Sequence, residues 1–136
     1  TQEGAGWFQY TMKHGKRWSA ARAFLLPAMK RPNLTVMTHA VVKRIVHDGE
    51  RASAVEFMNG QSSTLTARAK KEIILCAGAF ESPKLLMLSG IGPKNELMRH
   101  GIAVAKDLPG VGQNLHDHLF YPVSARGRVR SNNYYL

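Results

Sequence analysis

The sequence has one cysteine, few acidic residues and no long apolar run. With Cys76 alone, an internal disulfide is excluded, and no Cys/His spacing suits a closed zinc site. The longest apolar run, "EIILCAGAF", is too short to span a bilayer, and the sequence holds no signal-peptide pattern. We therefore expect no metal and no transmembrane segment, and the low cysteine usage favours a cytoplasmic protein.

Acidic residues are also scarce relative to basic ones. Nine Asp and Glu stand against 19 Lys and Arg, which gives a formal net charge of +10. This balance suits an anionic partner, and a basic module that binds nucleic acid is one interpretation. The basic residues nevertheless fall into separate short groups at 13–17, 30–31, 70–71 and 126–130, and no nucleic-acid-binding motif accompanies them. A solvated surface without nucleic acid is the favoured interpretation.

What is present is enough apolar material for a core. The 136 residues are 44% hydrophobic, which suits one modest domain and argues against disorder. The chain starts at Thr1 without an initiator Met and ends at "SNNYYL", so we expect a fragment of a larger protein. Residues 4–17 are typical of a loop or edge strand. Ser19 is placed to cap a short helix over "AARAFL", which Pro27 ends.

The middle of the sequence predicts an antiparallel β-meander over about 41–69. Residues 41–48, 52–58 and 63–69 are rich in β-branched and apolar residues. The turn signals "DGE" and "NGQ" separate them. Three strands joined by two tight turns are the expected result.

Residues 72–77 have a different pattern, because the run from Ile73 to Ala77 is continuously apolar. Such a run predicts a parallel strand covered on both faces, with Cys76 as a small buried hydrophobe. A helix is expected to follow, with Ser82 as its N-cap and Gly90 as its left-handed C-terminal residue. A second helix is expected between Pro93 and Gly101, followed by the short strand "IAVAKDL" and a Gly-rich loop over 109–118.

Several short motifs bear on chemistry. The G-x-G-x-x-G dinucleotide fingerprint is absent. At Ala77-Gly78-Ala79 the lack of bulky side chains permits either a ligand against the backbone or close strand-helix packing. Ser89 lacks the context of a nucleophile and is better explained by a helix end. His116, Asp117 and His118 are best explained as a hydrogen-bonded loop rather than as metal ligands or acid-base groups.

The stretch "GAFESPKLLMLSGIG" resembles the second signature of the glucose-methanol-choline (GMC) family of flavoprotein oxidoreductases. The matching residues are Gly78, Ala79, Ser82, Pro83, Leu85, Leu86, Ser89, Gly90, Ile91 and Gly92. The segments "GKRWSAARAFL", "RPNLTVMTHA" and "DLPGVGQNLHDH" are similar to the family's alcohol- and choline-dehydrogenase branch in order and spacing. The resemblance therefore covers nearly the whole chain.

The resemblance implies an α/β fold, part of a doubly wound, Rossmann-like FAD-binding domain with the antiparallel β-meander. The implied boundaries are 1–112 for this partial domain and 113–136 for the start of a substrate domain. FAD is the implied cofactor, and Val42, Ala77 and Gly78 are the implied contacts, Val42 through its backbone at the adenine end. The implied activity oxidises a CH-OH donor, a small alcohol or choline-like molecule, by hydride transfer to the flavin.

The same resemblance implies that other parts are needed. The family's N-terminal Gly-rich fingerprint and its C-terminal catalytic histidine have no match here, so we assign no catalytic residue and no metal ligand to this chain. We expect the isolated chain to be inactive and unstable, because its strand edges and apolar faces lack cover. A non-catalytic truncated product that pairs with another chain, and the basic nucleic-acid-binding module, remain as alternatives.

Overall fold

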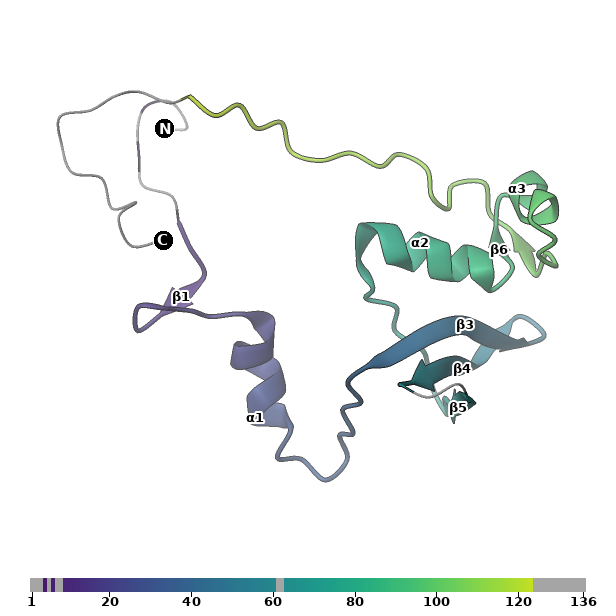
Figure 1. Ribbon diagram of the computed structural model, residues 1–136, viewed down its shortest axis with the longest axis horizontal. Coiled ribbons are helices and arrows are strands. Elements are labelled where there is room, and N and C mark those ends of the chain that lie inside the picture. The colour runs from purple at the N-terminus through teal and green to yellow at the C-terminus, as the bar shows by residue number, and fades with distance from the viewer. Residues whose placement is uncertain (1–3, 5, 7–8, 61–62, 124–136) are drawn as a thin grey trace.

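The computed structural model describes residues 4, 6, 9–60 and 63–123. A small N-terminal hairpin and helix lie apart from a lobe that contains a three-stranded sheet and two helices (Figure 1). After this lobe, residues 109–112 form turns and residues 113–123 run as an extended segment without helix or strand. The molecule is therefore open in outline, and its packing is concentrated between residues 40 and 108.

The N-terminal hairpin is formed by β1 (Met12–Lys13) and β2 (Lys16–Arg17), which pair antiparallel. Its two turn residues, His14 and Gly15, have φ angles of 51° and 70°. Two consecutive positive φ angles match the right-handed twist of a tight hairpin, which explains the glycine at the second position. The segment expected to be a loop or edge strand is thus a short hairpin.

A short helical segment follows the hairpin. It consists of η1 (Ala21–Leu25), in which the turns are widened to the π form, and α1 (Leu26–Ala28). The Ser19 hydroxyl accepts the backbone N–H of Arg22 at 3.4 Å, so Ser19 lies where its expected capping role requires. No residue of this helix is buried.

The β-meander predicted for 41–69 is confirmed. It consists of β3 (Ala40–Asp48), β4 (Arg51–Asn59) and β5 (Thr64–Arg68), antiparallel and in the spatial order β3-β4-β5. The turn between β3 and β4 contains Gly49 at a φ of 60°, as its "DGE" sequence indicates. The register shifts between Val42 and Arg44, where the extra residue of a β-bulge bends the strand.

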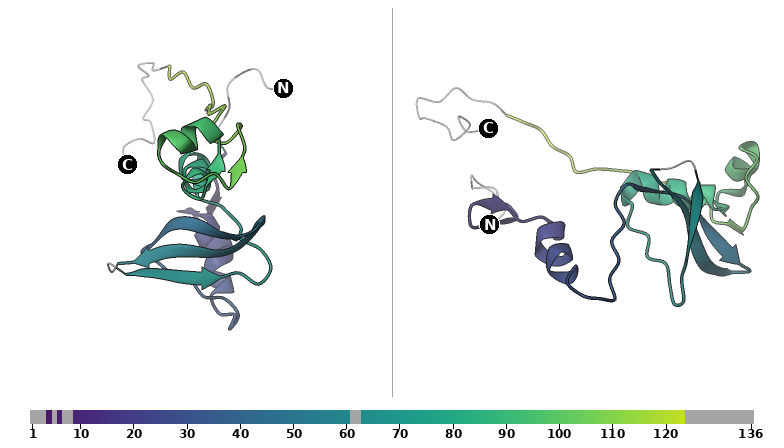
Figure 2. Two further views of the ribbon diagram at one scale, coloured as in Figure 1. Left: turned by 90° about the vertical axis from the view of Figure 1, so that its right-hand side faces the viewer. Right: turned by 60° about the horizontal axis from the view of Figure 1, so that its bottom comes forward.

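Helix α2 (Gly78–Leu88) packs against β3, one of the two edge strands of the described sheet (Figure 2). The core is small and joins these elements. Its buried hydrophobic residues are Ile45, Ala54, Phe57, Leu85 and Leu97. Leu97 comes from α3 (Lys94–Arg99), so both helices contribute to it.

The strand predicted for residues 72–77 is not formed in this structure. Ile73 and Leu75 are half-buried, whereas Ile74 is 75% exposed and Cys76 is exposed. The alternation fits an extended chain with one face covered, but the described residues hold no neighbouring strand to pair with it. The expectation that Cys76 is buried is therefore wrong here, since Cys76 lies on the uncovered face.

Helix α2 begins four residues earlier than the predicted cap at Ser82. Gly78, at a φ of 91°, turns the chain into the helix, and Pro83 lies inside the helix instead of at its first position. The Ser82 hydroxyl reaches back and accepts the Ala77 N–H at 3.0 Å. Ser82 thus satisfies a backbone donor ahead of the helix, while glycine supplies the conformation that the entry requires.

The predicted end of the second helix is confirmed in detail. Gly101 has a φ of 68°, its N–H donates to Met98 O at 3.1 Å, and the Ile102 N–H donates to Leu97 O at 2.9 Å. This pair of bonds is the Schellman arrangement. Before the helix, β6 (Ile91–Gly92) pairs in parallel with β7 (Lys106–Asp107), which closes this end of the lobe.

Candidate functional site

A groove of about 780 Å³ lies between β3, the extended residues before α2, and α2 itself. We call it the β3–α2 groove. Its walls are mainly apolar, with three charged residues among them. The lining residues are Ala40, Val41, Val42, Lys43, Ile74, Leu75, Cys76, Ala77, Glu81, Lys84, Leu85 and Leu88.

The structure brings two of the three residues implied as FAD contacts into this groove. Val42 comes from β3 and Ala77 from the segment that enters α2. Residues 35 positions apart in the sequence therefore line one groove. Gly78 follows Ala77 directly but is not among the lining residues. Its position is open, because a Cβ atom built on Gly78 would have no neighbour within 4 Å.

The groove leaves backbone accessible at both walls. β3 is an edge strand of the described sheet, and the bulge between Val42 and Arg44 interrupts its ladder at the groove. At the other wall, Ala77 has only a methyl side chain and is exposed. A flat ligand can therefore lie against the peptide groups of both segments, which suits recognition through main-chain atoms.

Charge in the groove comes mainly from α2. Lys84 Nζ lies 3.0 Å from a Glu81 carboxylate oxygen, and both side chains are largely exposed. Lys43 Nζ donates to Thr64 Oγ1 at 3.3 Å on β5. The groove thus combines apolar walls with a few polar groups, the usual composition of small-molecule sites.

Ser89 is the residue whose role the sequence did not reveal. Its side chain is 8% exposed, and its hydroxyl donates to Leu85 O at 2.6 Å while accepting the Ile45 N–H at 2.8 Å. Sequence reasoning placed Ser89 at a helix end, which is correct, but the contact with β3 spans 44 positions. No local signal reports such a contact, so only the fold could reveal it.

A charged pair lies on the sheet next to the bulge. Arg44 donates to both carboxylate oxygens of Glu56, at 2.7 and 2.8 Å. These hydrogen bonds hold the pKa of Glu56 below its ordinary value, and the charges of Arg44 and Lys43 act in the same direction while desolvation opposes them. The pKa of Arg44 is raised by the same hydrogen bonds. The pair fixes β3 against β4 across the sheet.

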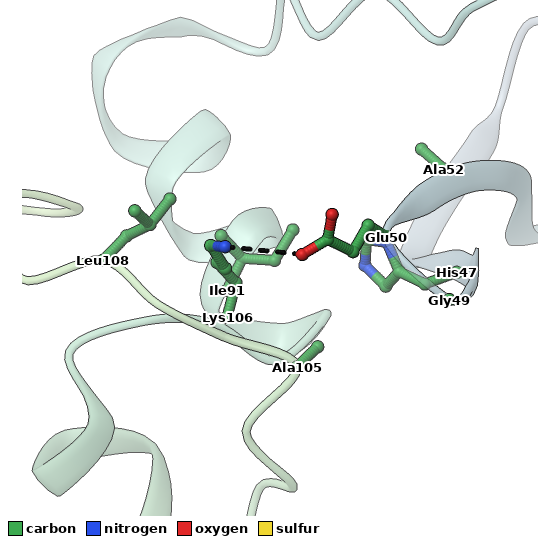
Figure 3. Close-up of a pocket in the computed structure, with 8 residues that line it drawn as sticks. All are labelled: His47, Gly49, Glu50, Ala52, Ile91, Ala105, Lys106 and Leu108. Atoms are coloured by element: carbon green, nitrogen blue, oxygen red, sulfur yellow. Dashed lines mark ion pairs between the residues drawn. The ribbon is translucent and has the colours of Figure 1, made fainter.

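A second cavity of about 300 Å³ lies at the other end of α2, between the β3–β4 turn and the residues around β6 and β7 (Figure 3). Lys106 Nζ and a Glu50 carboxylate oxygen are 3.6 Å apart across it. His47 also lines it, and its Nε2 atom is buried without a hydrogen-bond partner. One unpaired nitrogen in a largely apolar cavity does not identify a ligand.

The loop predicted for 109–118 has local hydrogen bonds. His116 Nδ1 lies 2.7 Å from Asn114 O, and the His118 N–H donates to Asp117 Oδ1 at 2.7 Å. In the described part of the chain, no group of three His, Cys, Asp or Glu residues is arranged to hold a metal ion. Within those same residues, no helix has the length and apolar character that crossing a membrane requires.

Comparison with known proteins places this geometry in a family. The family described as GMC oxidoreductase matches residues 1–120. The choline dehydrogenase of human mitochondria is 54% identical over 119 residues, which cover 87% of this chain and 20% of that protein. The oxygen-dependent choline dehydrogenase of Brucella anthropi is 52% identical over 118 residues, 87% of this chain and 21% of that protein. The chain thus spans about a fifth of the length of these relatives.

Solved structures with the same fold include three oxidoreductases. An FAD-dependent oxidoreductase from Chaetomium thermophilum has a TM-score of 0.69 at 41% identity, over 71% of this chain and 17% of the other. Pyridoxine 4-oxidase from Mesorbium loti has a TM-score of 0.66 at 39% identity, over 72% and 19%. A formate oxidase has a TM-score of 0.64 at 43% identity, over 65% and 16%. These proteins share their α/β architecture with this chain over most of its length.

Proposed function

Because this chain belongs to the GMC oxidoreductase family, we propose that it supplies part of the FAD site of an oxidoreductase that acts on CH-OH donors. The family match covers 120 of the 136 residues. Two choline dehydrogenases more than 50% identical to this chain favour a small alcohol of the choline type as the substrate. Both substrate and cofactor are proposals, since the chain spans about a fifth of these relatives.

The observation that carries the proposal is the β3–α2 groove. It joins Val42 and Ala77, which the family resemblance implies as cofactor contacts, in one space with accessible backbone and apolar walls. The adenine end of FAD is flat and largely apolar, with hydrogen-bonding groups at its rim, and such a group fits walls of this kind. Gly78 lies at the entry of α2 beside the groove, where its open surroundings leave space for a ligand.

In the proposed mechanism, this chain binds and orients, and the reacting groups lie elsewhere. Bound FAD supplies the acceptor for the hydride that leaves the alcohol carbon. Val42 holds the cofactor through its backbone, and the small side chain of Ala77 leaves room for the cofactor to approach the other wall. None of the described residues is assigned to removal of the hydroxyl proton. The segment therefore acts as a wall of the site.

A substitution that fills the groove tests the proposal. In the full-length protein, Ala77→Leu places a large side chain in the groove at an exposed position. We expect the dissociation constant for FAD, measured by quenching of flavin fluorescence, to rise about tenfold or more, which corresponds to about 1.4 kcal/mol. Ala67→Leu is the matched control, because Ala67 is exposed on β5 and does not line the groove.

Two results would contradict the proposal. If the full-length protein is folded and binds no FAD, the cofactor assignment is wrong. If Ala77→Leu and Ala67→Leu weaken FAD binding equally, the β3–α2 groove is not the binding site. DNA or RNA binding that falls steeply with rising salt, in a protein without flavin, would instead support the basic-module alternative.

A further inference from the structure

The hydroxyl of Ser89 connects the two walls of the β3–α2 groove. It accepts the Ile45 N–H of β3 at 2.8 Å and donates to Leu85 O of α2 at 2.6 Å. Ser89 is 8% exposed, so water does not readily replace either partner. Among the described residues, no other side-chain hydrogen bond joins β3 to α2 or to its C-terminal residue. The Ser89 hydroxyl is thus the polar link between the walls.

Both ends of this link are close to the groove. Leu85 is itself a lining residue, and Ile45 lies three residues after Val42 on the same strand. At about 3.3 Å per residue, Ile45 and Val42 are about 10 Å apart along β3. The bulge between Val42 and Arg44 lies between them, but both residues belong to one continuous strand. A shift of β3 at Ile45 therefore moves Val42 as well and changes the width of the groove.

The neighbouring residue, Gly90, prevents Ser89 from moving to compensate. The Gly90 carbonyl accepts the N–H groups of Ala105 at 2.8 Å and Lys106 at 3.1 Å. A Cβ atom on Gly90 would lie 2.5 Å from Ala103 O, so the backbone packs there without spare room. The position of Ser89 is consequently fixed by β7 and the residues before it. Through its hydrogen bond to the Ile45 N–H, the Ser89 hydroxyl in turn fixes β3.

We propose that Ser89 is a positioning residue for the cofactor, which sets β3 and α2 at the separation that the adenine end of FAD requires. The inference rests on the proposed function of the groove. Without the hydroxyl, the buried Ile45 N–H loses its acceptor, whereas Leu85 O keeps the Ser89 backbone N–H at 3.1 Å. β3 then moves to bring the Ile45 N–H to solvent or to another acceptor. The walls then separate, and the backbone at Val42 no longer meets the ligand.

The test uses Ser89→Ala in the full-length protein, with two readouts. We expect hydrogen exchange of the Ile45 amide to become faster, and the dissociation constant for FAD to rise about tenfold. Ser53→Ala is the matched control, because the Ser53 hydroxyl donates to Val46 O of β3 at 3.2 Å within the β3–β4 hairpin but does not link β3 to α2. It removes another hydroxyl that bonds a β3 backbone group, and we expect FAD affinity to stay within about threefold of the unsubstituted protein.

The inference is overturned if Ser89→Ala weakens FAD binding no more than Ser53→Ala does. If the unsubstituted protein still binds FAD, that result leaves the proposed function intact. If the unsubstituted protein does not bind FAD, the proposed function itself is refuted. If Ser89→Ala does not fold, Ser89→Thr is used in its place, because threonine retains the hydroxyl. A protected Ile45 amide with unchanged FAD affinity then supports the inference, and a protected amide with weakened FAD binding contradicts it.

Discussion

The residues before and after Ala40 differ in how they pack. Every buried hydrophobic residue of the described chain lies between Ile45 and Leu97, whereas residues 9–39 contain none. In the N-terminal part, Phe24 is 75% exposed, and Leu26 and Met29 are also exposed. The GMC oxidoreductase match nevertheless extends over both parts. Similarity to a family and self-sufficient packing are therefore separate properties, and here only residues 40–108 have both.

The two parts differ because only one of them contains elements on which its apolar residues can pack. In 40–108, three consecutive strands form a sheet and α2 then packs on it, so Phe57 and Leu85 are buried within the segment. In 9–39, a hairpin whose strands have two residues each is followed by a short helix, and neither packs on a larger sheet. The apolar residues of the N-terminal part need a surface that residues 40–108 do not offer.

The largest expected effect contrasts one phenylalanine from each part. Phe57 is 6% exposed, so Phe57→Ala leaves a cavity and should destabilise the full-length protein by about 3–5 kcal/mol. Phe24→Ala removes an exposed ring of the same size, and should change stability by about 0.5 kcal/mol or less. Urea titrations of both variants measure this. A comparable loss at Phe24 would show that the N-terminal part has a packed partner in the full-length protein, and would end the contrast.

An intermediate effect is expected at the two helix-end glycines of the packed part. Gly90 and Gly101 have φ angles of 82° and 68°, so alanine at either is strained by about 1–2 kcal/mol. At Gly90 the new Cβ also meets the Ala103 carbonyl, whereas at Gly101 it meets nothing within 4 Å. Gly90→Ala should therefore cost about 1–3 kcal/mol more than Gly101→Ala in urea unfolding. Equal costs would mean that β7 does not constrain this corner.

The smallest effect concerns pH. Because the pKa of Glu56 is lower in the folded than in the unfolded state, the Arg44–Glu56 pair stabilises the fold above the unfolded pKa. This contribution is lost as pH falls through the lowered folded pKa. Glu56→Gln should therefore lower the urea midpoint at about pH 7, and the difference should shrink near pH 3. A difference that is independent of pH would mean that the carboxylate charge is not what holds β3 to β4.

Much of the packed part was predictable because its signals are local. The "DGE" turn, the alternating strands and the glycine at position 101 each require only a few neighbouring residues. The meander and the end of the second helix at Gly101 were therefore predicted correctly. The start of α2 was predicted at Ser82, because Ser-Pro is a common helix opening. The sequence gives no sign that Gly78 turns the chain four residues earlier, since that conformation depends on how the chain leaves the groove.

The candidate site was predictable only in part. The resemblance selected Val42 and Ala77, and the structure places both in one groove, although their contact with FAD remains a prediction. The link through Ser89 depends on two segments meeting at the atomic level, which no periodicity encodes. The strand expected at 72–77 was inferred from its apolar run, but a strand requires a hydrogen-bonding neighbour, which the described residues do not supply.

The bond between Ser89 and Ile45 also bears on the order in which the lobe folds. The β3–β4 hairpin closes through a tight turn, an event of microseconds, whereas the Ser89 contact closes 44 positions of chain and has a larger entropic cost. We therefore expect local strand pairing to come first and the docking of α2 later. An interaction formed after the transition state slows unfolding while leaving the folding rate almost unchanged. We thus expect the serine at the end of α2 to lower the rate at which the lobe unfolds.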